Sequence, residues 1–108
     1  MHQAIYEQLK RIAKVQTTTT YTEIAPLAGL VMCNPTDRNE IARILGEIST
    51  YEHSQGRPLL SAVVILQDKN IPGQGFFTLA RELGLYSGGD DLSFFCRELV
   101  KVHETWKG

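Results

Sequence analysis

The chain has 108 residues, enough for one domain with one hydrophobic core, and we expect a single domain over residues 1–108. Apolar residues make up 43% of the sequence and charged residues 21%, proportions that are ordinary for a globular protein. The net charge of -1 excludes a strong overall field of either sign, so the composition does not by itself indicate a nucleic-acid-binding protein.

The sequence carries no sign of export or membrane insertion. Its first residues lack the apolar stretch of a signal peptide, and no run approaches the ~18 apolar residues of a membrane-spanning helix. Cys33 and Cys96 lie far apart and in no C-x-x-C pattern, which indicates two free thiols in a reducing compartment. A disulfide or a catalytic cysteine is the alternative. We therefore expect a cytoplasmic protein with no membrane partner.

The N-terminal part of the chain predicts a helix followed by an extended segment. Residues 3–14 carry an apolar stripe at helical spacing, formed by Ile5, Leu9 and Ile12. Cations gather near the end of this helix, where they suit its dipole; they are Lys10, Arg11 and Lys14. Residues 15–20 are rich in β-branched side chains, which disfavour a helix and indicate a short extended segment.

A capping box predicts where the second helix starts. The Thr20 hydroxyl can accept a hydrogen bond from the backbone N–H of Glu23, and the glutamate carboxylate can reach back to the N–H of Thr20. The helix is therefore expected to begin at Tyr21 and to close at Gly29. Pro26 lacks a backbone donor and should shorten or kink this helix.

A longer helix is expected from about Pro35 to Glu52. Asn34 or Thr36 would cap it, and its apolar side chains follow the i, i+3, i+4, i+7 pattern. Gly46 inside this helix costs about 1 kcal/mol relative to alanine. We expect this glycine to allow close packing against another element.

The segment that follows predicts a strand and a helix. Residues 59–66 are nearly all apolar and rich in β-branched side chains, which indicates a buried strand. A polar turn and a glycine-bearing loop come next. The helix after them should begin near Gly75 or Phe76 and end at Leu83.

The last helix should run from a cap at Asp90 or Asp91 to about Trp106. Its inner face is expected to hold Leu92, Phe95, Cys96, Leu99, Val102 or His103, and Trp106. Phe94 and Val100 lie off that face, where core packing is favoured over a partner surface. The whole pattern indicates an α+β, mainly helical domain with about five helices and a very small sheet.

Two segments resemble the alkylguanine-DNA alkyltransferases and the catalytically inactive alkyltransferase-like proteins. Residues 20–29, TYTEIAPLAG, are similar to the family's T-Y-G-E-I-A-x-L-A-G stretch, and residues 42–46, ARILG, are similar to its A-R-A-V-G. The order of the predicted elements is similar as well. The resemblance implies a winged helix-turn-helix that sits on the minor groove of DNA, with Arg43 inserted into the duplex to support nucleotide flipping.

The family's nucleophile motif, P-C-H-R-V, is missing. It should fall near residues 59–64, which read LLSAVV and contain no cysteine, histidine or arginine. A thiolate nucleophile needs a cysteine beside a group that lowers its pKa, and neither Cys33 nor Cys96 lies in that context. The resemblance therefore implies no alkyl transfer. Residues 57–63 and 72–77 also resemble small bacterial proteins of uncharacterised function, a likeness that implies no chemistry.

The resemblance makes the long helix the candidate DNA-binding element. DNA binding would place Arg38, Asn39 and Arg43 at the groove, with Tyr21 and Thr22 touching phosphate. The alternative for Arg43 is a solvated arginine paired with Glu40 or Glu47 on its own helix. The charges favour this alternative, because residues 20–57 hold three arginines against five carboxylates.

Three further groups of residues have candidate roles. The loop residues Gly73, Gln74 and Gly75 precede a helix and would bind an anion or a partner, although a structural turn is favoured. A cluster of Glu47, Glu52, His53, Arg57 and Ser61 would support acid–base or nucleophilic chemistry only if its members converge, and a local polar cluster of Glu52 and Arg57 is favoured. The histidines His2, His53 and His103 are scattered, so no metal is expected.

The sequence therefore favours a non-enzymatic, nucleic-acid-associated or regulatory module, and the resemblance implies that it binds duplex DNA through a helix-turn-helix. The alternative is a protein-interaction module that binds a protein partner or a second copy of itself. A small hydrolase or transferase is the least favoured interpretation. No catalytic residue and no cofactor are expected.

Overall fold

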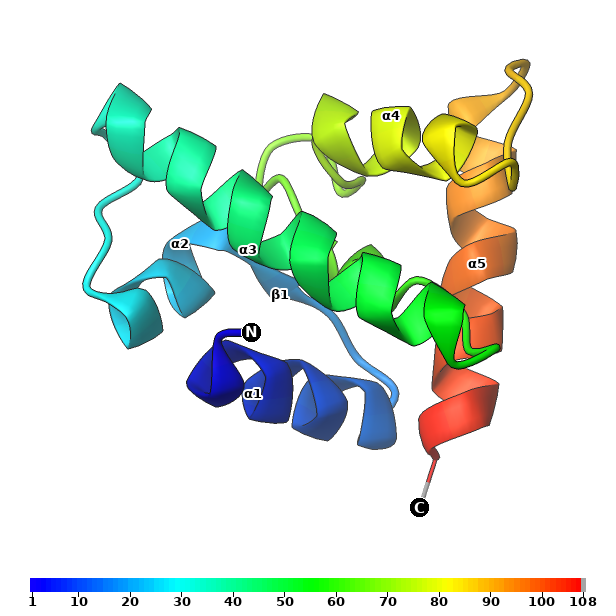
Figure 1. Ribbon diagram of the computed structural model, residues 1–108, viewed down its shortest axis with the longest axis horizontal. Coiled ribbons are helices and arrows are strands. Elements are labelled where there is room, and N and C mark those ends of the chain that lie inside the picture. Colours follow the sequence, from blue (N-terminus) through cyan, green and yellow to red (C-terminus); the bar gives the residue numbers. More distant parts are fainter. Residues whose placement is uncertain (108) are drawn as a thin grey trace.

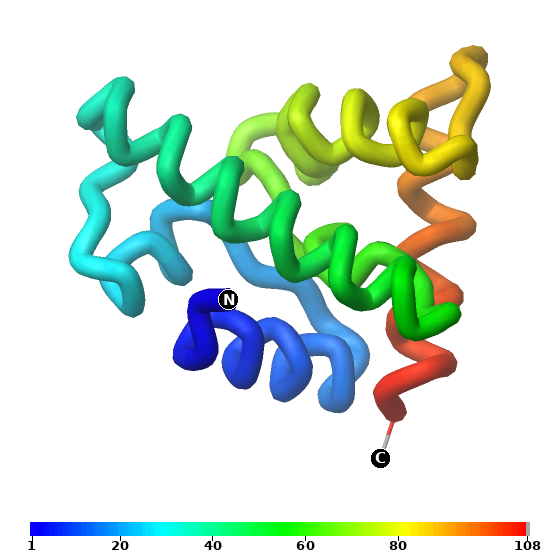
Figure 2. The backbone as a smooth tube through the Cα atoms, in the orientation of Figure 1, coloured from blue at the N-terminus to red at the C-terminus, as the bar shows by residue number. Residues whose placement is uncertain are grey.

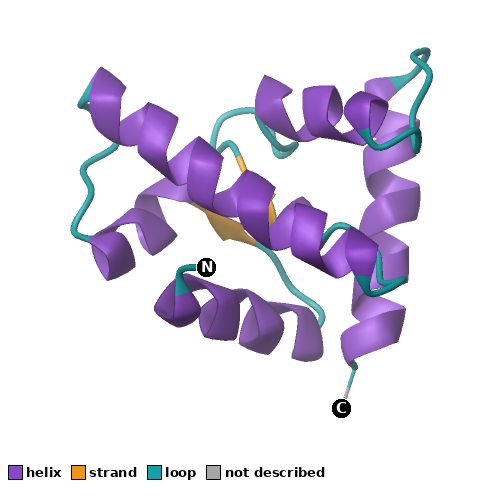
Figure 3. Cartoon of the chain, in the orientation of Figure 1, coloured by secondary structure: helices purple, strands orange, loops and turns teal. Residues whose placement is uncertain are grey.

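The computed structural model describes residues 1–107, which form a mainly helical α+β fold with one very small sheet (Figure 1, Figure 3). The elements in chain order are α1 (Gln3–Lys14), β1 (Thr19–Thr20), α2 (Tyr21–Ile24), η1 (Ala25–Ala28), α3 (Pro35–Ser54), η2 (Leu60–Val63), β2 (Val64–Ile65), α4 (Gln74–Glu82) and α5 (Asp91–Trp106), where η marks a 3₁₀ helix. This is the fold class that the sequence predicts. None of the helices in this part of the chain combines the length and the hydropathy that crossing a membrane requires.

The 3₁₀ helix η2 occupies the middle of the core. Helices α1, α3 and α5 all pack against it (Figure 2). The apolar side chains of residues 59–64 are fully buried. The strands β1 and β2 pair in parallel, with Thr19 opposite Val64 and Thr20 opposite Ile65. The sheet therefore ties the segment before α2 to the centre of the fold.

The prediction of a strand over residues 59–66 is wrong for most of the segment. Within residues 1–107 its only partner strand is the two-residue β1, so a longer ladder would leave backbone groups unpaired in the core. The backbone instead turns through η2 and finds side-chain acceptors. The buried carboxylate of Glu98 accepts from the N–H of Leu59 at 2.8 Å, and the Ser49 hydroxyl accepts from the N–H of Ser61 at 3.1 Å.

The capping box at the start of α2 is confirmed, with one change. The Thr20 hydroxyl accepts from the backbone N–H of Glu23 at 3.2 Å, but it also donates to the Glu23 carboxylate, which was expected to reach the backbone of Thr20. Pro26 shortens the helix as predicted, because the α-helical turn gives way to the 3₁₀ helix η1. Gly29 closes the segment at φ 69, a left-handed conformation that favours glycine.

Helix α3 begins at Pro35 and is capped by Asn34, whose side-chain oxygen accepts from the N–H of Thr36 at 2.9 Å. It runs to Ser54, two residues beyond the predicted end. The expectation that Gly46 allows close packing is wrong, because no atom lies within 4 Å of the position that its Cβ would take. Gly46 instead lines a pocket, which is described below.

Replacing Gly46 with alanine should raise the free energy of unfolding by up to about 1 kcal/mol. The position is helical and has open space for a methyl group, so the substitution removes backbone freedom from the unfolded chain without a clash. Gly29→Ala is the matched control, since φ 69 strains any side chain there and the change should destabilise. Urea unfolding of both variants checks the prediction, and a loss of stability in Gly46→Ala would contradict it.

Helix α4 begins at Gln74, one residue before the predicted start, and α5 spans Asp91–Trp106 with Asp90 as its cap. The predicted inner face of α5 is partly wrong, because Leu92 and Cys96 are exposed. Phe95 and Val102 are buried as predicted, and the helix also buries Phe94 and Glu98.

The reason for this rotated face is an aromatic cluster between α5, α4 and the loop that joins them. Phe94 stacks on Tyr86 with ring centroids 4.5 Å apart and also lies against Phe76 and Phe77 of α4. Core packing of Phe94 is thus confirmed, and α4 covers it. Val100 remains 60% exposed.

Candidate nucleic-acid interface

An apolar pocket of about 180 Å³ opens between α3, α4 and the start of α2. Its walls include Tyr21 from α2, then Ala42, Leu45 and Gly46 from α3, and Phe76 and Leu79 from α4. Tyr21 belongs to the first segment that resembles the alkyltransferases, and residues 42–46 are the second. The fold therefore brings the two segments together around one cavity, although residues 30–41 separate them in the sequence.

Tyr21 fixes the wall of the pocket nearest to α4. Its hydroxyl accepts a hydrogen bond from the backbone N–H of Gly73 at 2.8 Å, across 52 residues of sequence. Burial raises the pKa of this phenol above its ordinary value, more than the Gly73 bond lowers it. A Cβ on residue 73 would approach the hydroxyl oxygen to 3.3 Å, so glycine suits this contact. Tyr21 is thus a part of the pocket, and its exposed neighbour Thr22 is the freer of the two predicted phosphate contacts.

Arg38 lies at the rim of the same pocket, on the first turn of α3. Its guanidinium donates to the carbonyl oxygen of Met32 at 3.0 Å and is otherwise exposed, as is the neighbouring Asn39. The connector before α3 is held by Asp37, which accepts from the N–H of Val31 at 2.9 Å. Arg38 therefore places a positive charge beside an apolar cavity, on a helix start that hydrogen bonds hold to the preceding connector.

Arg43 makes the local ion pair that the helical spacing favours. Its Nε and Nη2 donate to the two carboxylate oxygens of Glu40 at 2.8 and 2.7 Å, and Glu47 lies 3.9 Å away. The hydrogen bond raises the pKa of Arg43 and lowers the pKa of Glu40. The Arg43 side chain is nonetheless 61% exposed, so the pair can exchange with another anion.

The loop before α4 is a structural turn that borders the pocket. The N–H of Gly73 already bonds to Tyr21, and the carbonyl oxygen of Gly73 accepts from the N–H of Phe76 at 3.1 Å. Gln74 and Gly75 are exposed at the helix start. The loop thus positions the pocket wall. The N–H of Gly73 is occupied by Tyr21, and the N–H of Phe76 is occupied by the carbonyl oxygen of Gly73.

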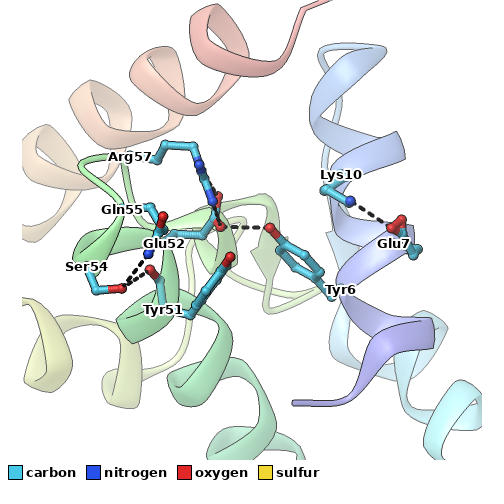
Figure 4. A network of polar contacts seen from close by, with 8 residues as sticks. All are labelled: Tyr6, Glu7, Lys10, Tyr51, Glu52, Ser54, Gln55 and Arg57. Carbon is cyan, nitrogen blue, oxygen red and sulfur yellow. Dashed lines mark hydrogen bonds and ion pairs between the residues drawn. The ribbon is translucent and has the colours of Figure 1, made fainter.

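Glu52 and Arg57 form the predicted polar cluster, and the cluster is larger than expected (Figure 4). The Glu52 side chain is fully buried at the end of α3 and accepts two bonds from Arg57, at 2.9 and 2.8 Å. The Tyr6 hydroxyl of α1 donates to the same carboxylate at 2.9 Å. Arg57 also lies over the rings of Tyr51 and Trp106. The network ties α1, α3 and α5 together through one buried carboxylate.

Glu47, His53 and Ser61 do not converge in one pocket. Ser61 lines the apolar pocket and bonds to Ser49 at 2.6 Å, whereas Glu47 faces Arg43 and the N-terminal amine on the surface. His53 lines neither this pocket nor the groove between α1 and α5 that is described below. These three residues therefore do not form the set that acid–base or nucleophilic chemistry at this place would need.

The cysteines and the metal-binding side chains are spread over the described part of the chain. Cys33 and Cys96 are both exposed and free, as the sequence indicates. Across residues 1–107, no three histidine, cysteine or acidic side chains lie close enough together to hold a metal ion.

Comparison of the chain with protein families, with curated proteins and with solved structures finds no match. The resemblance to the alkyltransferases stays an expectation that rests on residues 20–29 and 42–46 and on the order of the elements.

Proposed function

We propose that this protein is a non-enzymatic DNA-binding module that presents α2 and α3 to a duplex and accepts one unstacked base in the pocket between α3 and α4. The observation that carries the proposal is the shared cavity of the two resembling segments, with the Arg38 guanidinium at its rim. A base that leaves its stack is recognised in an apolar and aromatic pocket, and Tyr21 and Phe76 supply such walls.

The proposal gives each element of a winged helix-turn-helix a counterpart. Helices α2 and α3 form the helix-turn-helix, and the loop between β2 and α4 takes the place of the wing. Arg38 and Asn39 lie at the exposed start of α3, and Thr22 lies at the start of α2, where backbone N–H groups favour phosphate.

The surface charges make this a weak, salt-sensitive binder. Arg38 and Arg43 are the two exposed arginines of α3, and carboxylates surround them. Arg43 must leave Glu40 to reach a phosphate, so Glu40 competes with DNA for it. Phosphate contacts supply most of the affinity of such modules. Because few cations are free here, the affinity should be low, and it should fall further as the salt concentration rises.

The test is fluorescence anisotropy with short labelled duplexes, with and without an alkylated guanine, at low and near-physiological salt. Arg38→Ala should weaken binding about tenfold at low salt, because it removes one phosphate contact. Glu40→Gln should strengthen binding, since it releases Arg43, whereas Arg43→Ala should weaken it less than Arg38→Ala does. Arg97→Ala, which removes an exposed arginine from α5, is the matched control and should change nothing.

A pocket-filling variant tests the base-accepting half of the proposal. Ala42 is exposed at the pocket wall, so Ala42→Phe should fill the cavity and abolish any preference for the alkylated duplex while it leaves salt-dependent binding intact. An unchanged preference in Ala42→Phe would contradict a role for the pocket. Absence of duplex binding even at low salt would refute the whole proposal.

The alternative function, a protein-interaction module, is favoured by a different surface. Leu92, Cys96 and Val100 follow one another at four-residue spacing on α5, and all three are exposed. A partner protein or a second copy of the chain would cover this stripe. Sedimentation of the protein without DNA tests for the second copy.

A further inference from the structure

A groove of about 430 Å³ lies between the C-terminal ends of α1 and α5, away from the apolar pocket. Figure 2 shows these two helix ends side by side, and the two helices are in contact. The groove is lined by Glu7, Lys10, Arg11 and Lys14 of α1 and by Trp106 of α5. Its volume lies in the range in which proteins bind small molecules or single residues of a polymer.

The α1 wall of the groove carries a surplus of positive charge in a protein whose net charge is -1. Glu7 pairs with Lys10 at 2.7 Å, and Lys10 also lies over the ring of Tyr6 (Figure 4). Arg11 and Lys14 are exposed, and within residues 1–107 neither has an acidic side chain in ion-pair distance. One helical turn apart, they present two unneutralised cations along the same wall.

The opposite wall is the only tryptophan of the chain. The guanidinium of Arg57 lies 5.6 Å from the ring of Trp106 and anchors it to the buried Glu52. The indole N–H is shielded from solvent and has no acceptor among the described residues, so Trp106 lines the groove through the carbon atoms of its ring. The groove thus combines an aromatic platform held by an ion pair with a row of cations.

We propose that this groove binds a single strand of nucleic acid, with one base against Trp106 and the backbone phosphates along Arg11 and Lys14. Aromatic side chains that stack bases, combined with cations that follow the backbone, are the two components of single-strand binding sites. A duplex fits less well, because its bases are stacked on one another and offer no face to the indole. The groove shares no lining residue with the pocket proposed to accept a base.

Because Trp106 is the sole tryptophan, its fluorescence reports binding in this groove directly. Titration with a short oligothymidine should quench the emission to saturation, and the affinity should fall as salt rises. The double variant Arg11→Gln, Lys14→Gln should lose about ten- to hundredfold in affinity at low salt and lower the slope of log K against log salt by about 1.4, because two phosphate contacts are removed. Neutral glutamines avoid placing a carboxylate at the C-terminal end of α1.

The matched control removes the same charge elsewhere. Lys69→Gln, Arg97→Gln changes two exposed cations outside the groove and should bind as the parent protein does. Three results would overturn the proposal: no change in Trp106 emission, quenching that the groove variant retains, or equal quenching by an acidic peptide of matched charge. Arg38→Ala distinguishes the two binding sites, since it should weaken duplex binding and leave the quenching by oligothymidine unchanged.

Discussion

Replacing Arg57 with alanine should lower the free energy of unfolding by about 3 kcal/mol, because the change leaves the buried Glu52 carboxylate without its cation. Glu52 has no solvent exposure, and its remaining partner would be the Tyr6 hydroxyl. Arg57 is only 31% exposed and holds both carboxylate oxygens, which is the geometry in which a partner's loss costs most. The same substitution removes a cation from the ring of Trp106.

Urea unfolding measures this loss, and two variants separate its causes. Arg97→Ala removes an exposed arginine of α5 and should change stability by less than about 0.5 kcal/mol. The double variant Glu52→Gln, Arg57→Met removes both charges and should recover part of the loss, since no unpaired charge remains in the core. A cost below about 1 kcal/mol for Arg57→Ala would show that water reaches Glu52 in its absence.

Local signals in the sequence predicted most of the helix boundaries. Thr20, Asn34 and Asp90 each cap the helix that their position indicates, because a cap depends on bonds to residues two or three positions away. The ion pair of Glu40 with Arg43 is predictable for the same reason, since the two residues are three positions apart on one helix.

The strand over residues 59–66 and the inner face of α5 were mispredicted because both depend on distant neighbours. Hydrophobic periodicity shows that a segment is buried, but a fully apolar run looks the same whether a sheet or several helices surround it. Here three helices surround η2, and the buried carboxylate of Glu98 supplies a backbone acceptor from 39 residues away. In α5 the apolar side chains of Leu92 and Phe94 point to different sides of the helix, and only one of them can face the core. Phe94 is buried because it stacks on the ring of Tyr86, and Leu92 is exposed.

The candidate sites divide in the same way. The resembling segments pointed to Tyr21 and to residues 42–46, but the pocket between them depends on the bond from Gly73 to Tyr21, which no local pattern encodes. The cations at the end of α1 are visible in the sequence, where they suit the helix dipole, but nothing near them in the sequence predicts a groove. Their groove exists because Trp106 packs opposite them, at the other end of the chain. The positive charge of this wall can therefore be predicted from the sequence, but the tryptophan that lies opposite it cannot.

The Tyr6 phenol gives the second large effect, a loss of stability at alkaline pH. Burial raises the pKa of Tyr6 to about 12 from an ordinary value of 10.0, and its hydrogen bond to Glu52 adds to the increase. The unfolded chain therefore releases this proton first as the pH rises. The contribution of Tyr6 to stability is complete below pH 10.0, declines between the two pKa values and is lost above about 12. A difference of this size corresponds to about 2–3 kcal/mol.

Tyr6→Phe isolates this contribution from the other tyrosines, because Tyr21 and Tyr86 also have raised pKa values and add to the alkaline loss in both proteins. At pH of about 9 the variant should be less stable than the parent by about 1–2 kcal/mol, since Glu52 loses a charge-accepting hydrogen bond. That gap should close as the pH approaches about 12, where the parent must either deprotonate a buried phenol beside a carboxylate or unfold. Urea unfolding across this range measures the gap. A gap that stays constant with pH would mean that Tyr6 titrates alike in the folded and unfolded chains, and the network around Glu52 would then be open to water.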